Sequence, residues 1–504
     1  MRLCIRADAN SAIGTGHIMR CIALAQAWQD QGGHVTFVSH CESTALAQRI
    51  IREGFGFIPI EYPHPHPSDI RHTLDALSAI SYQLSANCWF VLDGYHFTPE
   101  YHKAIRDTGI CLLVIDDMNH LPYYRADILL NQNIHATDLE YCCNGDAILL
   151  LGSRYVLLRR EFLKYRHFKR QTPNKAKKIL VTLGGADPDN VTLKIIKALN
   201  LLKNSDIEVR VVVGPANPHV ASLKHELDSS PFAFHLLQSV NNMPELMAWA
   251  DLAISAAGST CWELIFLSLP TIVLVLTENQ LPVAEYLMNN EAVVNLGWSN
   301  QCSCDSISLF LESFLQDKDL RDRLSTNGST LVNGQGASLT TDCMIWRDIE
   351  LREVTNDDRE LIWLWANDEE ARKASYSQHH ISWDEHVCWF SYTILRKDIR
   401  FYVAENRNKE PFGQIRFVLN NDEAIISLSI ARESRFHGYG NVVLTKAIRK
   451  VFNESKIRRL VAYVKAENKA SAKLFQRAGF CLVEEIFISR ARSYKMIMER
   501  EALK

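Results

Sequence analysis

The chain has 504 residues, of which 47% are hydrophobic and 22% are charged, and its 55 basic and 58 acidic residues leave a net charge of −3. At roughly 150 residues per domain we expect about three domains, each with its own hydrophobic core. The near-neutral charge gives no reason to expect nucleic-acid binding, and the lack of any apolar run of ~18 residues excludes a membrane-spanning helix.

The 13 cysteines are scattered without a disulfide framework, and neither Cys142-Cys143 nor Cys302-x-Cys304 has the spacing of zinc ligands. We therefore expect free thiols and no metal. The sequence begins with a strand-like pattern rather than an apolar targeting segment, so we expect a cytoplasmic protein.

The first 160 residues alternate short apolar runs with amphipathic stretches. Residues 2–8 are predicted to form a strand, 17–31 a helix whose apolar positions share one face, and 34–39 the next strand. Further apolar runs at 88–92, 111–115 and 148–151 each lead into a polar loop. This alternation is typical of a parallel sheet with helices on its faces, so residues 1–160 are predicted to form an α/β domain.

A basic, polar segment from Lys164 to Lys178 is predicted to be a linker, although a solvated helix end fits it nearly as well. A second α/β domain over residues 170–335 follows it. Its first strand, 178–183, ends at Gly184-Gly185, and strands at 209–213, 252–255 and 271–276 continue the sheet. Both domains would gather loops at the carboxyl ends of their strands, where such folds bind ligands.

From Leu351 the pattern changes to that of an α+β domain over residues 350–500. We expect a helix at 356–371, strands at 400–405, 413–418 and 425–430, a helix at 441–453 and a strand at 460–464. A glycine-containing turn lies between the last strand of the first group and the second helix. Backbone N–H groups at such a turn can bind phosphate.

The turn Gly14-Thr15-Gly16-His17 joins the first predicted strand to the first helix. It lacks the third glycine of the dinucleotide fingerprint, and the next strand ends in Ser39-His40 rather than an acidic residue, so a nicotinamide cofactor is not expected. The two glycines allow a ligand to approach the backbone closely. His17 then lies in the first helical turn and faces the cleft expected between the two α/β domains. This position favours a role as general base over a structural role.

Acidic residues follow two predicted strands: Asp93 comes after 90–92, and Asp116-Asp117 after 113–115. Carboxylates at a sheet end can orient a histidine, bind sugar hydroxyls or cap helices, and the sequence leaves these alternatives open. In the second domain, Gly258-Ser259-Thr260 precedes a helix that holds Glu263. The N–H groups of this turn can face a diphosphate, and Glu263 can accept from ribose hydroxyls.

Over residues 1–335 these features resemble the UDP-sugar hydrolase of pseudaminic acid biosynthesis, which cleaves UDP-2,4-diacetamido-2,4,6-trideoxy-β-L-altrose. The resemblance is carried, in chain order, by Arg6-Ala7-Asp8, Ile13-Gly14-Thr15-Gly16-His17-Ile18-Met19-Arg20-Cys21, Leu92-Asp93-Gly94-Tyr95, Ile115-Asp116-Asp117, Leu183-Gly184-Gly185-Ala186-Asp187 and Gly258-Ser259-Thr260-x-x-Glu263. It implies a glycosyltransferase-B-like pair of Rossmann-like domains, and a UDP-sugar attacked by water without a metal.

The same resemblance assigns roles to single residues. It implies that His17 is the catalytic base and that Tyr95 and Asn279 contact the sugar. The UDP-binding residues that it implies are Gly14, Gly16, Gly184, Gly185, Gly258, Ser259, Thr260 and Glu263.

The turn Arg435-Phe436-His437-Gly438-Tyr439-Gly440 and the downstream segment from Asn468 to Phe480 resemble the GCN5-related N-acetyltransferases (GNAT) over residues 350–500. In that superfamily, successive N–H groups of the turn bind coenzyme A. The resemblance implies acetyl-CoA as co-substrate, bound by residues 435–440, Asn468 and Phe475. Phe475 stands where many relatives carry a thiolate-protonating tyrosine, so the acid is open, with Tyr463 as a substitute and Glu433 as a base acting through water.

Together the resemblances imply a bifunctional enzyme. Its third domain would acetylate the 4-amine of a UDP-amino sugar, and its first two domains would release UDP from the diacetamido product. Two alternatives stay open, a glycosyltransferase of the same architecture and a non-catalytic nucleotide-sugar-binding module that presents substrate to the acetyltransferase. Release of UDP without an added acceptor separates them. The sequence leaves the oligomeric state unknown.

Overall fold

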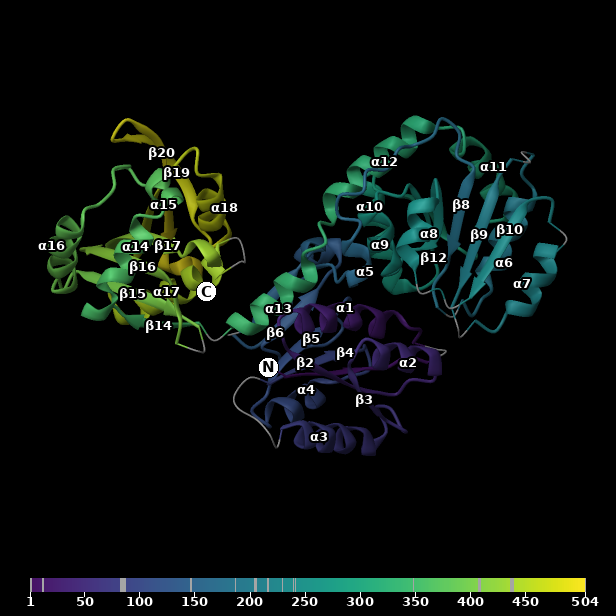
Figure 1. Cartoon of the computed structure of the whole chain (residues 1–504), viewed down its shortest axis with the longest axis horizontal. Coiled ribbons are helices and arrows are strands. Elements are labelled where there is room, and N and C mark those ends of the chain that lie inside the picture. Colours follow the sequence, from purple (N-terminus) through teal and green to yellow (C-terminus); the bar gives the residue numbers. More distant parts are fainter. Residues whose placement is uncertain are drawn as a thin grey trace. The chain divides into compact units, whose positions relative to one another are not determined.

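The computed structural model describes residues 2–10, 13–81, 88–145, 147–185, 187–203, 206–214, 217–228, 230–238, 240, 242–347, 349–406, 409–435 and 439–503. The chain divides into two compact units, Met1–Thr341 (unit 1) and Asp342–Lys504 (unit 2) (Figure 1). Unit 1 holds two parallel sheets and unit 2 holds one mixed sheet. The predicted fold class is therefore confirmed.

The first lobe of unit 1, residues 2–151, is built on short and mainly apolar strands. These are β1 (Arg2–Ala7), β2 (His34–Ser39), β3 (Gly56–Pro59), β4 (Cys88–Asp93), β5 (Cys111–Ile115), β6 (Ile128–Asn131) and β7 (Ile148–Leu151). They pair in the order β3-β2-β1-β4-β5-β6-β7. The helices of this lobe are α1 (Gly16–Asp30), α2 (Thr44–Arg52), α3 (Pro67–Ser81) and α4 (Pro99–Arg106), with the 3-10 helix η1 (Ile134–Asp138). Figure 1 shows α1 on one side of the sheet and α3 and α4 on the other.

The strands of the first lobe are buried on both faces, which explains their continuous apolar runs. Leu3, Cys4 and Ile5 of β1 are completely buried, although successive side chains of a strand point to opposite faces. The sequence did not predict β3 or β6. The reason for β3 is that Gly56 and Pro59 are typical turn residues, and for β6 that only residues 128–130 are apolar.

The second lobe, residues 178–298, repeats this architecture. Its strands are β8 (Lys178–Thr182), β9 (Glu208–Val213), β10 (Ala233–Gln238), β11 (Leu252–Ala256), β12 (Thr271–Val275) and β13 (Val294–Trp298), in the order β10-β9-β8-β11-β12-β13. Its helices are α6 (Val191–Asn200), α7 (Val220–Asp228), α8 (Met243–Trp249), α9 (Thr260–Phe266), α10 (Leu281–Asn289) and the 3-10 helix η3 (Glu278–Gln280). The edge strands β10 and β13 were not predicted, since their partly exposed residues break the apolar pattern.

Alternate residues of the central strand β8 pack against two different layers of helices. Ile179 and Val181 belong to the core that contains α6 and α11 (Cys304–Phe314), whereas Leu180 belongs to the core that contains α8 and α9. The helices α12 (Lys318–Leu331) and α13 (Gly336–Trp346) follow α11. The sheet is thus covered on both faces, and only its strand ends are left to form a site.

A connecting segment joins the two lobes. It contains η2 (Ser153–Tyr155) and the short helix α5 (Arg160–Leu163), after which residues 164–177 form neither helix nor strand. The predicted linker, rather than the helix end, is what the structure contains. Arg170 fastens this linker to the second lobe, because its guanidinium donates to the backbone oxygens of Met247 (2.6 Å) and Leu267 (3.1 Å).

Unit 2 is a seven-stranded sheet with helices. The strands are β14 (Glu350–Glu353), β15 (Ile399–Glu405), β16 (Pro411–Asn420), β17 (Glu423–Ile430), β18 (Arg459–Lys465), β19 (Cys481–Ile488) and β20 (Ala491–Glu499), in the order β14-β15-β16-β17-β18-β20-β19. The helices are α14 (Arg359–Ala366), α15 (Glu369–Ala374), α16 (Trp383–Ile394), α17 (Tyr439–Glu454) and α18 (Lys469–Arg477), with the 3-10 helices η4 (Asn356–Asp358), η5 (Arg432–Ser434) and η6 (Arg500–Leu503). Among the described strands of unit 2, β17 and β18 pair in parallel and the other pairs are antiparallel.

The single helix predicted over 356–371 is wrong. The chain forms η4 and α14, leaves the helix at Asn367 and begins α15 at Glu369. The break has a local cause, because the Asp368 side chain accepts a hydrogen bond from the Ala371 N–H (3.1 Å) and so caps a new helix.

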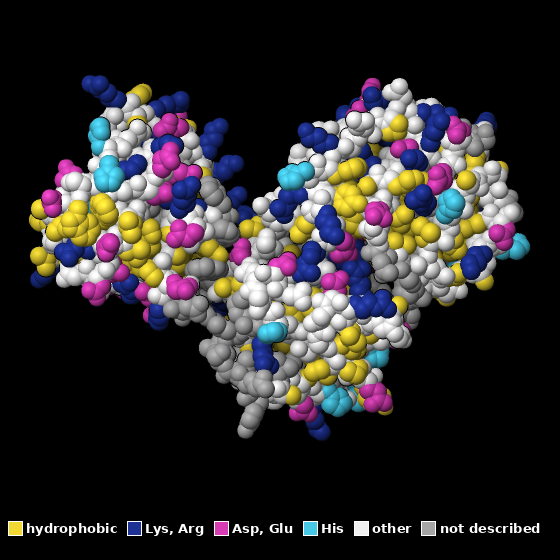
Figure 2. All heavy atoms as spheres, in the orientation of Figure 1, with side chains coloured by type: hydrophobic (Ala, Val, Ile, Leu, Met, Phe, Trp, Pro, Cys, Tyr) yellow, Lys and Arg dark blue, Asp and Glu magenta, His cyan; other side chains and the backbone are white. Residues whose placement is uncertain are grey.

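The surface of the molecule carries mixed charge. On the face that Figure 2 shows, acidic and basic side chains are interspersed, and a group of hydrophobic side chains is exposed over α16. Trp383 and Trp389 of this helix are 40% and 39% exposed. Among the described residues, no helix combines the length and the apolar character needed to cross a bilayer.

Candidate active site

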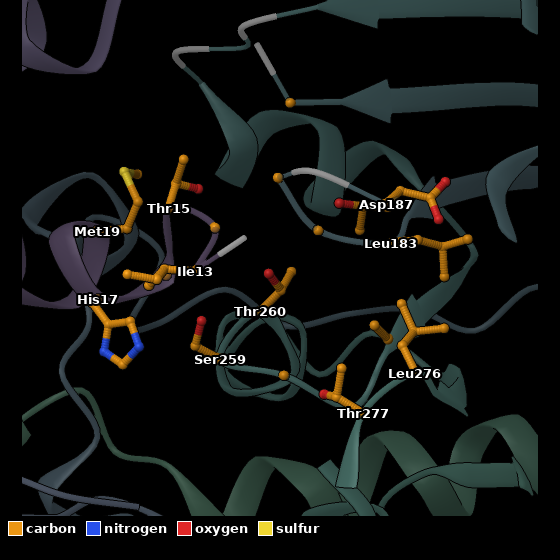
Figure 3. Close-up of a pocket in the computed structure, with 18 of the residues that line it drawn as sticks. Ile13, Thr15, His17, Met19, Leu183, Asp187, Ser259, Thr260, Leu276 and Thr277 are labelled. Carbon is orange, nitrogen blue, oxygen red and sulfur yellow. The ribbon is translucent and has the colours of Figure 1, made fainter. Parts of the chain in front are cut away.

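Unit 1 contains a cleft of ≈ 1350 Å³ between its two lobes. The first lobe contributes the turn after β1 and the start of α1, and the second lobe contributes the loops after β8, β11 and β12. In Figure 3, His17 and Thr15 lie on one side of this cleft, and Ser259, Thr260 and Asp187 lie on the other. The cleft is therefore at the carboxyl ends of both parallel sheets, as predicted.

The loops of the two lobes approach each other closely at Gly185. A Cβ added to Gly185 would lie 2.7 Å from the Thr15 Oγ1 atom, closer than real Cβ contacts, whereas one added to Gly16 would make an ordinary contact, 3.5 Å from the Ser259 Oγ atom. Gly184 has a φ of +99°, a conformation that L side chains rarely adopt. Of the glycines predicted to bind the ligand, Gly185 thus also allows the two lobes to approach each other at Thr15.

His17 lies in the first turn of α1 and is held by a buried carboxylate. Its Nδ1 atom is 2.6 Å from Oδ1 of Asp93, which is the last residue of β4 and is completely buried. An ionised carboxylate only accepts hydrogen bonds, so this contact assigns the ring proton to Nδ1 and leaves Nε2 with a free lone pair. Among the described residues, no protein group is hydrogen-bonded to Nε2. The geometry is that of a general base.

Arg20, one helical turn after His17, binds the same carboxylate. Its Nε donates to Asp93 Oδ2 (2.7 Å), its Nη2 donates to Asp93 Oδ1 (2.6 Å), and its Nη1 donates to Asp117 Oδ2 (2.5 Å). The Tyr95 hydroxyl donates to the same Asp117 oxygen (2.8 Å). The rings of Tyr95 and His17 make an edge contact with centroids 4.9 Å apart. These five residues form one hydrogen-bonded network, of which His17 and Tyr95 line the cleft.

The protonation states of Asp93 and Tyr95 depend on the charged residues that contact them. Burial alone would raise the pKa of Asp93, but the Arg20 guanidinium and the His17 imidazole outweigh it and hold that pKa well below its usual range. Burial, together with the Asp117 charge, raises the pKa of Tyr95 far above that of a free phenol. At neutral pH, Asp93 is therefore a carboxylate and Tyr95 is a neutral hydroxyl.

The structure shows what each of these acidic residues contacts, so the roles that the sequence left open can be compared. Asp93 orients the histidine. Asp116 caps its own loop, because its Oδ1 atom accepts from the backbone N–H groups of Met118 (3.0 Å) and Asn119 (2.6 Å). Asp117 joins Arg20 to Tyr95 and also accepts from the Asn133 amide (3.1 Å).

All residues of unit 1 predicted to form the site line the same cleft. These are Gly14, Gly16, His17, Tyr95, Gly184, Gly185, Gly258, Ser259, Thr260, Glu263 and Asn279. Asn279 accepts a hydrogen bond from the Thr277 hydroxyl (2.6 Å), and Glu263 is bound by Arg159 (2.7 Å). Their roles stay predictions. Ala186, part of the motif that carried the resemblance, lies outside the described residues.

Sequence reasoning named Arg20 only within a motif and did not name Arg159, although both are buried. Arg20 holds the buried Asp93 carboxylate, and Arg159 holds the Glu263 carboxylate of the cleft. Arg20 had a local signal, since it stands three residues after His17 on the same helix face. Arg159 had none, because its partner is 104 residues away in the chain. No group of three or more metal-ligating side chains occurs in the described parts of the chain.

In unit 2, the predicted phosphate-binding turn falls partly outside the described residues, which exclude Phe436, His437 and Gly438. Arg435 is held by an ion pair with Asp368 (2.6 Å) and by the backbone oxygen of Ile430 (2.8 Å). Its guanidinium therefore anchors the base of the turn. Tyr439 is 5% exposed, and its ring packs on Phe412.

The start of α17 provides the features that a phosphate site needs. It is a 16-residue helix, and its first N–H groups have no acceptor inside the helix. A Cβ on Gly440 would lie 3.4 Å from Leu474 of α18, so the two helices approach each other closely at this end. Asn468 caps α18 by accepting from Ser471 N–H (3.0 Å), and Phe475 packs in the core against Phe480. The predicted contacts of Asn468 and Phe475 stay predictions.

The strands β17 and β18 stop pairing before they end. Their parallel ladder runs from Glu423↔Arg459 to Ile426↔Ala462, whereas the strands continue to Ile430 and Lys465. In this described part of the sheet, the facing edges of both strands beyond the ladder offer backbone hydrogen-bonding groups to a third molecule. The gap in pairing opens at the same end of β17 as the start of α17.

Comparison with known families agrees with this division. Residues 348–481 match the family model of the acetyltransferase (GNAT) domain. Unit 2 is a GNAT acetyltransferase domain. Residues 178–304, which span the second lobe, match the glycosyltransferase family 28 C-terminal domain. The predicted resemblance to nucleotide-sugar enzymes and to GNAT proteins is confirmed.

The relatives that are similar to this chain include the following three. An uncharacterized protein of Methanocaldococcus jannaschii is 24% identical over 95% of this chain and 96% of its own length, so the match includes both unit 1 and the GNAT domain. The UDP-2,4-diacetamido-2,4,6-trideoxy-beta-L-altropyranose hydrolase of Campylobacter jejuni is 25% identical over 57% of this chain and 96% of its own length. Acetyltransferase PseH of Campylobacter jejuni is 23% identical over 26% of this chain and 83% of its own length.

Proposed function

We propose that this chain is a bifunctional nucleotide-sugar enzyme. The GNAT domain transfers an acetyl group from acetyl-CoA to the 4-amine of a UDP-amino sugar, and unit 1 then hydrolyses the UDP-diacetamido-trideoxy sugar to free sugar and UDP. The names of two relatives, a UDP-sugar hydrolase and an acetyltransferase, support the pairing of these reactions.

One observation carries the hydrolase assignment. The His17 imidazole turns its Nδ1 edge to the buried Asp93 carboxylate at 2.6 Å and faces a cleft that the family 28-like lobe completes. A histidine that only supported the fold would not need an open lone pair beside a wide cleft. Ser259 and Thr260 of the second lobe stand across the cleft from His17 in Figure 3.

The proposed chemistry needs one activated water. Nε2 of His17 removes a proton from that water, and the oxygen attacks the anomeric carbon as the bond from this carbon to the diphosphate oxygen breaks. The bonding electrons leave with UDP. Asp93 stabilises the imidazolium that forms, and general-base help of this kind is typically worth about 10²- to 10⁴-fold in rate.

The leaving diphosphate needs positive potential rather than a proton. The turn Gly258-Ser259-Thr260 precedes α9, and backbone N–H groups at such a position favour a negative charge. Gly184-Gly185 brings a second stretch of backbone to the same cleft. Tyr95 and Asn279, from opposite lobes, are proposed to contact the sugar between these groups and His17.

In the GNAT domain, the amine nitrogen of the sugar would attack the thioester carbonyl carbon of acetyl-CoA and lose a proton, and the carbon–sulfur bond would break, so that CoA leaves as a thiolate and is protonated. The start of α17 would hold the pyrophosphate through backbone N–H groups, and Arg435, which begins the turn, is held by Asp368. The unpaired edges of β17 and β18 lie at the same end. Glu433 is exposed and Tyr463 is half-buried, and both remain candidates for moving the protons of this step.

The order of the reactions provides the test. The full chain is incubated with acetyl-CoA and the UDP-4-amino sugar, and the products are followed by mass spectrometry. We expect a gain of one acetyl group before UDP appears. His17→Phe should accumulate the acetylated UDP-sugar, with UDP affinity unchanged. If His17→Phe lost both its affinity for UDP and its ability to release UDP from the sugar, the base role would be contradicted.

The match to a glycosyltransferase domain favours a second candidate, in which a sugar acceptor replaces the water. UDP release in the absence of any acceptor distinguishes hydrolysis from transfer. A chain that binds UDP, acetylates the sugar and releases no UDP under either condition would be the non-catalytic binding module instead.

A further inference from the structure

Arg159 is buried in the connecting segment between the two lobes, and its exposed fraction is 4%. Its Nη2 and Nε atoms donate to one oxygen, Oε1 of Glu263, at 2.7 and 3.2 Å. Its third nitrogen, Nη1, is 3.0 Å from a Glu161 carboxylate oxygen. The flat guanidinium also packs over the Phe162 ring, with 5.0 Å between Cζ and the ring centroid. These contacts fix both the position and the plane of the group.

This arrangement orients the Glu263 carboxylate. Both hydrogen bonds from Arg159 end on Oε1, and no described protein group is hydrogen-bonded to the other oxygen, Oε2. Glu263 lines the cleft from the first turn of α9, and its side chain is 15% exposed. Its second oxygen is therefore a fixed acceptor beside the turn Gly258-Ser259-Thr260.

Glu161, the second carboxylate that contacts Arg159, is itself bound by residues of the first lobe. Glu161 accepts from Arg49 of α2 at 2.7 Å, and Arg49 is 3.5 Å from Glu53 at the end of the same helix. Gln26 of α1, which is nearly buried, donates to Glu53 at 3.0 Å. A chain of charged and polar contacts therefore runs from α1 and α2 of the first lobe, through the connecting segment, to Glu263 in the second lobe.

Arg159 is unsuited to binding a phosphate directly, although it lines the cleft. All three of its nitrogens contact carboxylates, and two negative charges face its one positive charge. Burial raises the pKa of Glu263, and the Arg159 guanidinium opposes that effect by favouring the ionised carboxylate. Its electrostatic role is directed at Glu263.

We propose that Arg159 is a positioning residue for the nucleotide: it holds Glu263 so that Oε2 accepts hydrogen bonds from the ribose hydroxyls of the UDP moiety. This inference rests on the proposed function, because it needs a ribonucleotide in the cleft. It adds to that function a selection of ribose over deoxyribose, made by a residue that does not itself touch the sugar.

Calorimetric titration of the full chain with UDP and with 2′,3′-dideoxy-UDP tests the inference without using catalysis. A hydrogen bond to an ionised group is worth roughly 10- to 100-fold in affinity, so the wild-type chain should prefer UDP by about that factor. Glu263→Gln should reduce this preference to a few-fold. Arg159→Gln should reduce it equally, and the double variant should lose no more than either single variant.

Arg159→Lys keeps the charge and the aliphatic stem, so it guards against a variant that fails to fold. A single ammonium nitrogen cannot make the paired contact, so its ribose preference should also fall several-fold. The matched control is Arg160→Gln. Arg160 is the next residue and donates to Gln26, Gln29 and Asp30 of α1, but not to Glu263. The control should keep the wild-type preference.

The possible outcomes distinguish a failure of the proposed function from a failure of the role of Arg159. A wild-type chain that binds neither nucleotide would overturn the proposed function and this inference with it. A wild-type chain that prefers UDP, while folded Arg159→Lys and Arg159→Gln prefer it to the same extent, would overturn only the role of Arg159. An equal loss of ribose preference in Arg160→Gln would also overturn the role of Arg159, because the effect would then come from a general disturbance of the connecting segment between the lobes.

Discussion

Replacing Asp93 by asparagine removes the charge that holds the His17 imidazole while keeping the shape of the side chain. In the structure, Asp93 Oδ1 is 2.6 Å from His17 Nδ1, and the same carboxylate accepts two hydrogen bonds from Arg20. An asparagine amide can satisfy only part of this set, and it can present N–H groups to a nitrogen that is itself protonated. The variant should therefore lose activity and stability for separate reasons.

The expected size of each loss follows from these contacts. A hydrogen bond to a charged partner is worth about 1.5–3 kcal/mol, so the hydrolysis rate should fall by roughly 10- to 150-fold. Arg20 keeps Asp117 as a second partner. Removing the ion pair between Arg20 and Asp93 should therefore lower the free energy of unfolding by about 3 kcal/mol, which is the lower end of the range for breaking a buried ion pair.

Two measurements separate the effects. Release of UDP from the diacetamido sugar is measured under saturating substrate, well below the melting temperature, and unfolding is followed by circular dichroism. Asp116→Asn is the control, since this neighbour of Asp117 caps its own loop and makes no contact with His17 or Arg20 among the described residues. A folded Asp93→Asn chain with a kcat within about twofold of wild type would refute the reasoning, because the predicted minimum is about tenfold.

Two further predictions concern stability and the width of the cleft. Burial lowers the pKa of His102 to about 4, so the unfolded chain binds a proton that the folded chain excludes. Stability contributed by the neutral ring is complete above about pH 6.5 and should fall by about 2 kcal/mol on going to pH 5, a loss that His102→Gln should remove in urea titrations. In the cleft, a Cβ on Gly214 would lie 2.0 Å from the Gly185 oxygen, whereas one on Gly145 would meet nothing within 4 Å. Gly214→Ala should displace the loop and lower kcat/KM for UDP release at least about tenfold, and Gly145→Ala should not; equal values would contradict the steric argument.

The secondary structure was most predictable where one apolar pattern filled a whole element. The buried strands β1 and β8 and the helix α1 are examples, and each agrees with its predicted range to within a few residues. The edge strands β10 and β13 have mixed exposure and gave no such pattern. The helix expected at 356–371 looked continuous because its apolar residues keep a helical period, but the cap at Asp368 divides it.

The sequence by itself determined the features that depend on near neighbours. The glycines of the turn and the place of His17 in the first turn of α1 follow from residues adjacent in the chain. The tertiary structure alone decided what His17 and the cleft residues contact. Asp93 is 76 residues from His17, and Arg159 is 104 residues from Glu263. Several acidic residues follow strands in this chain, and only the folding of the strands into one parallel sheet brings Asp93, rather than Asp116, to the histidine. A hydrogen bond depends on distances of about 3 Å between atoms, and sequence spacing carries no such information for residues on different strands.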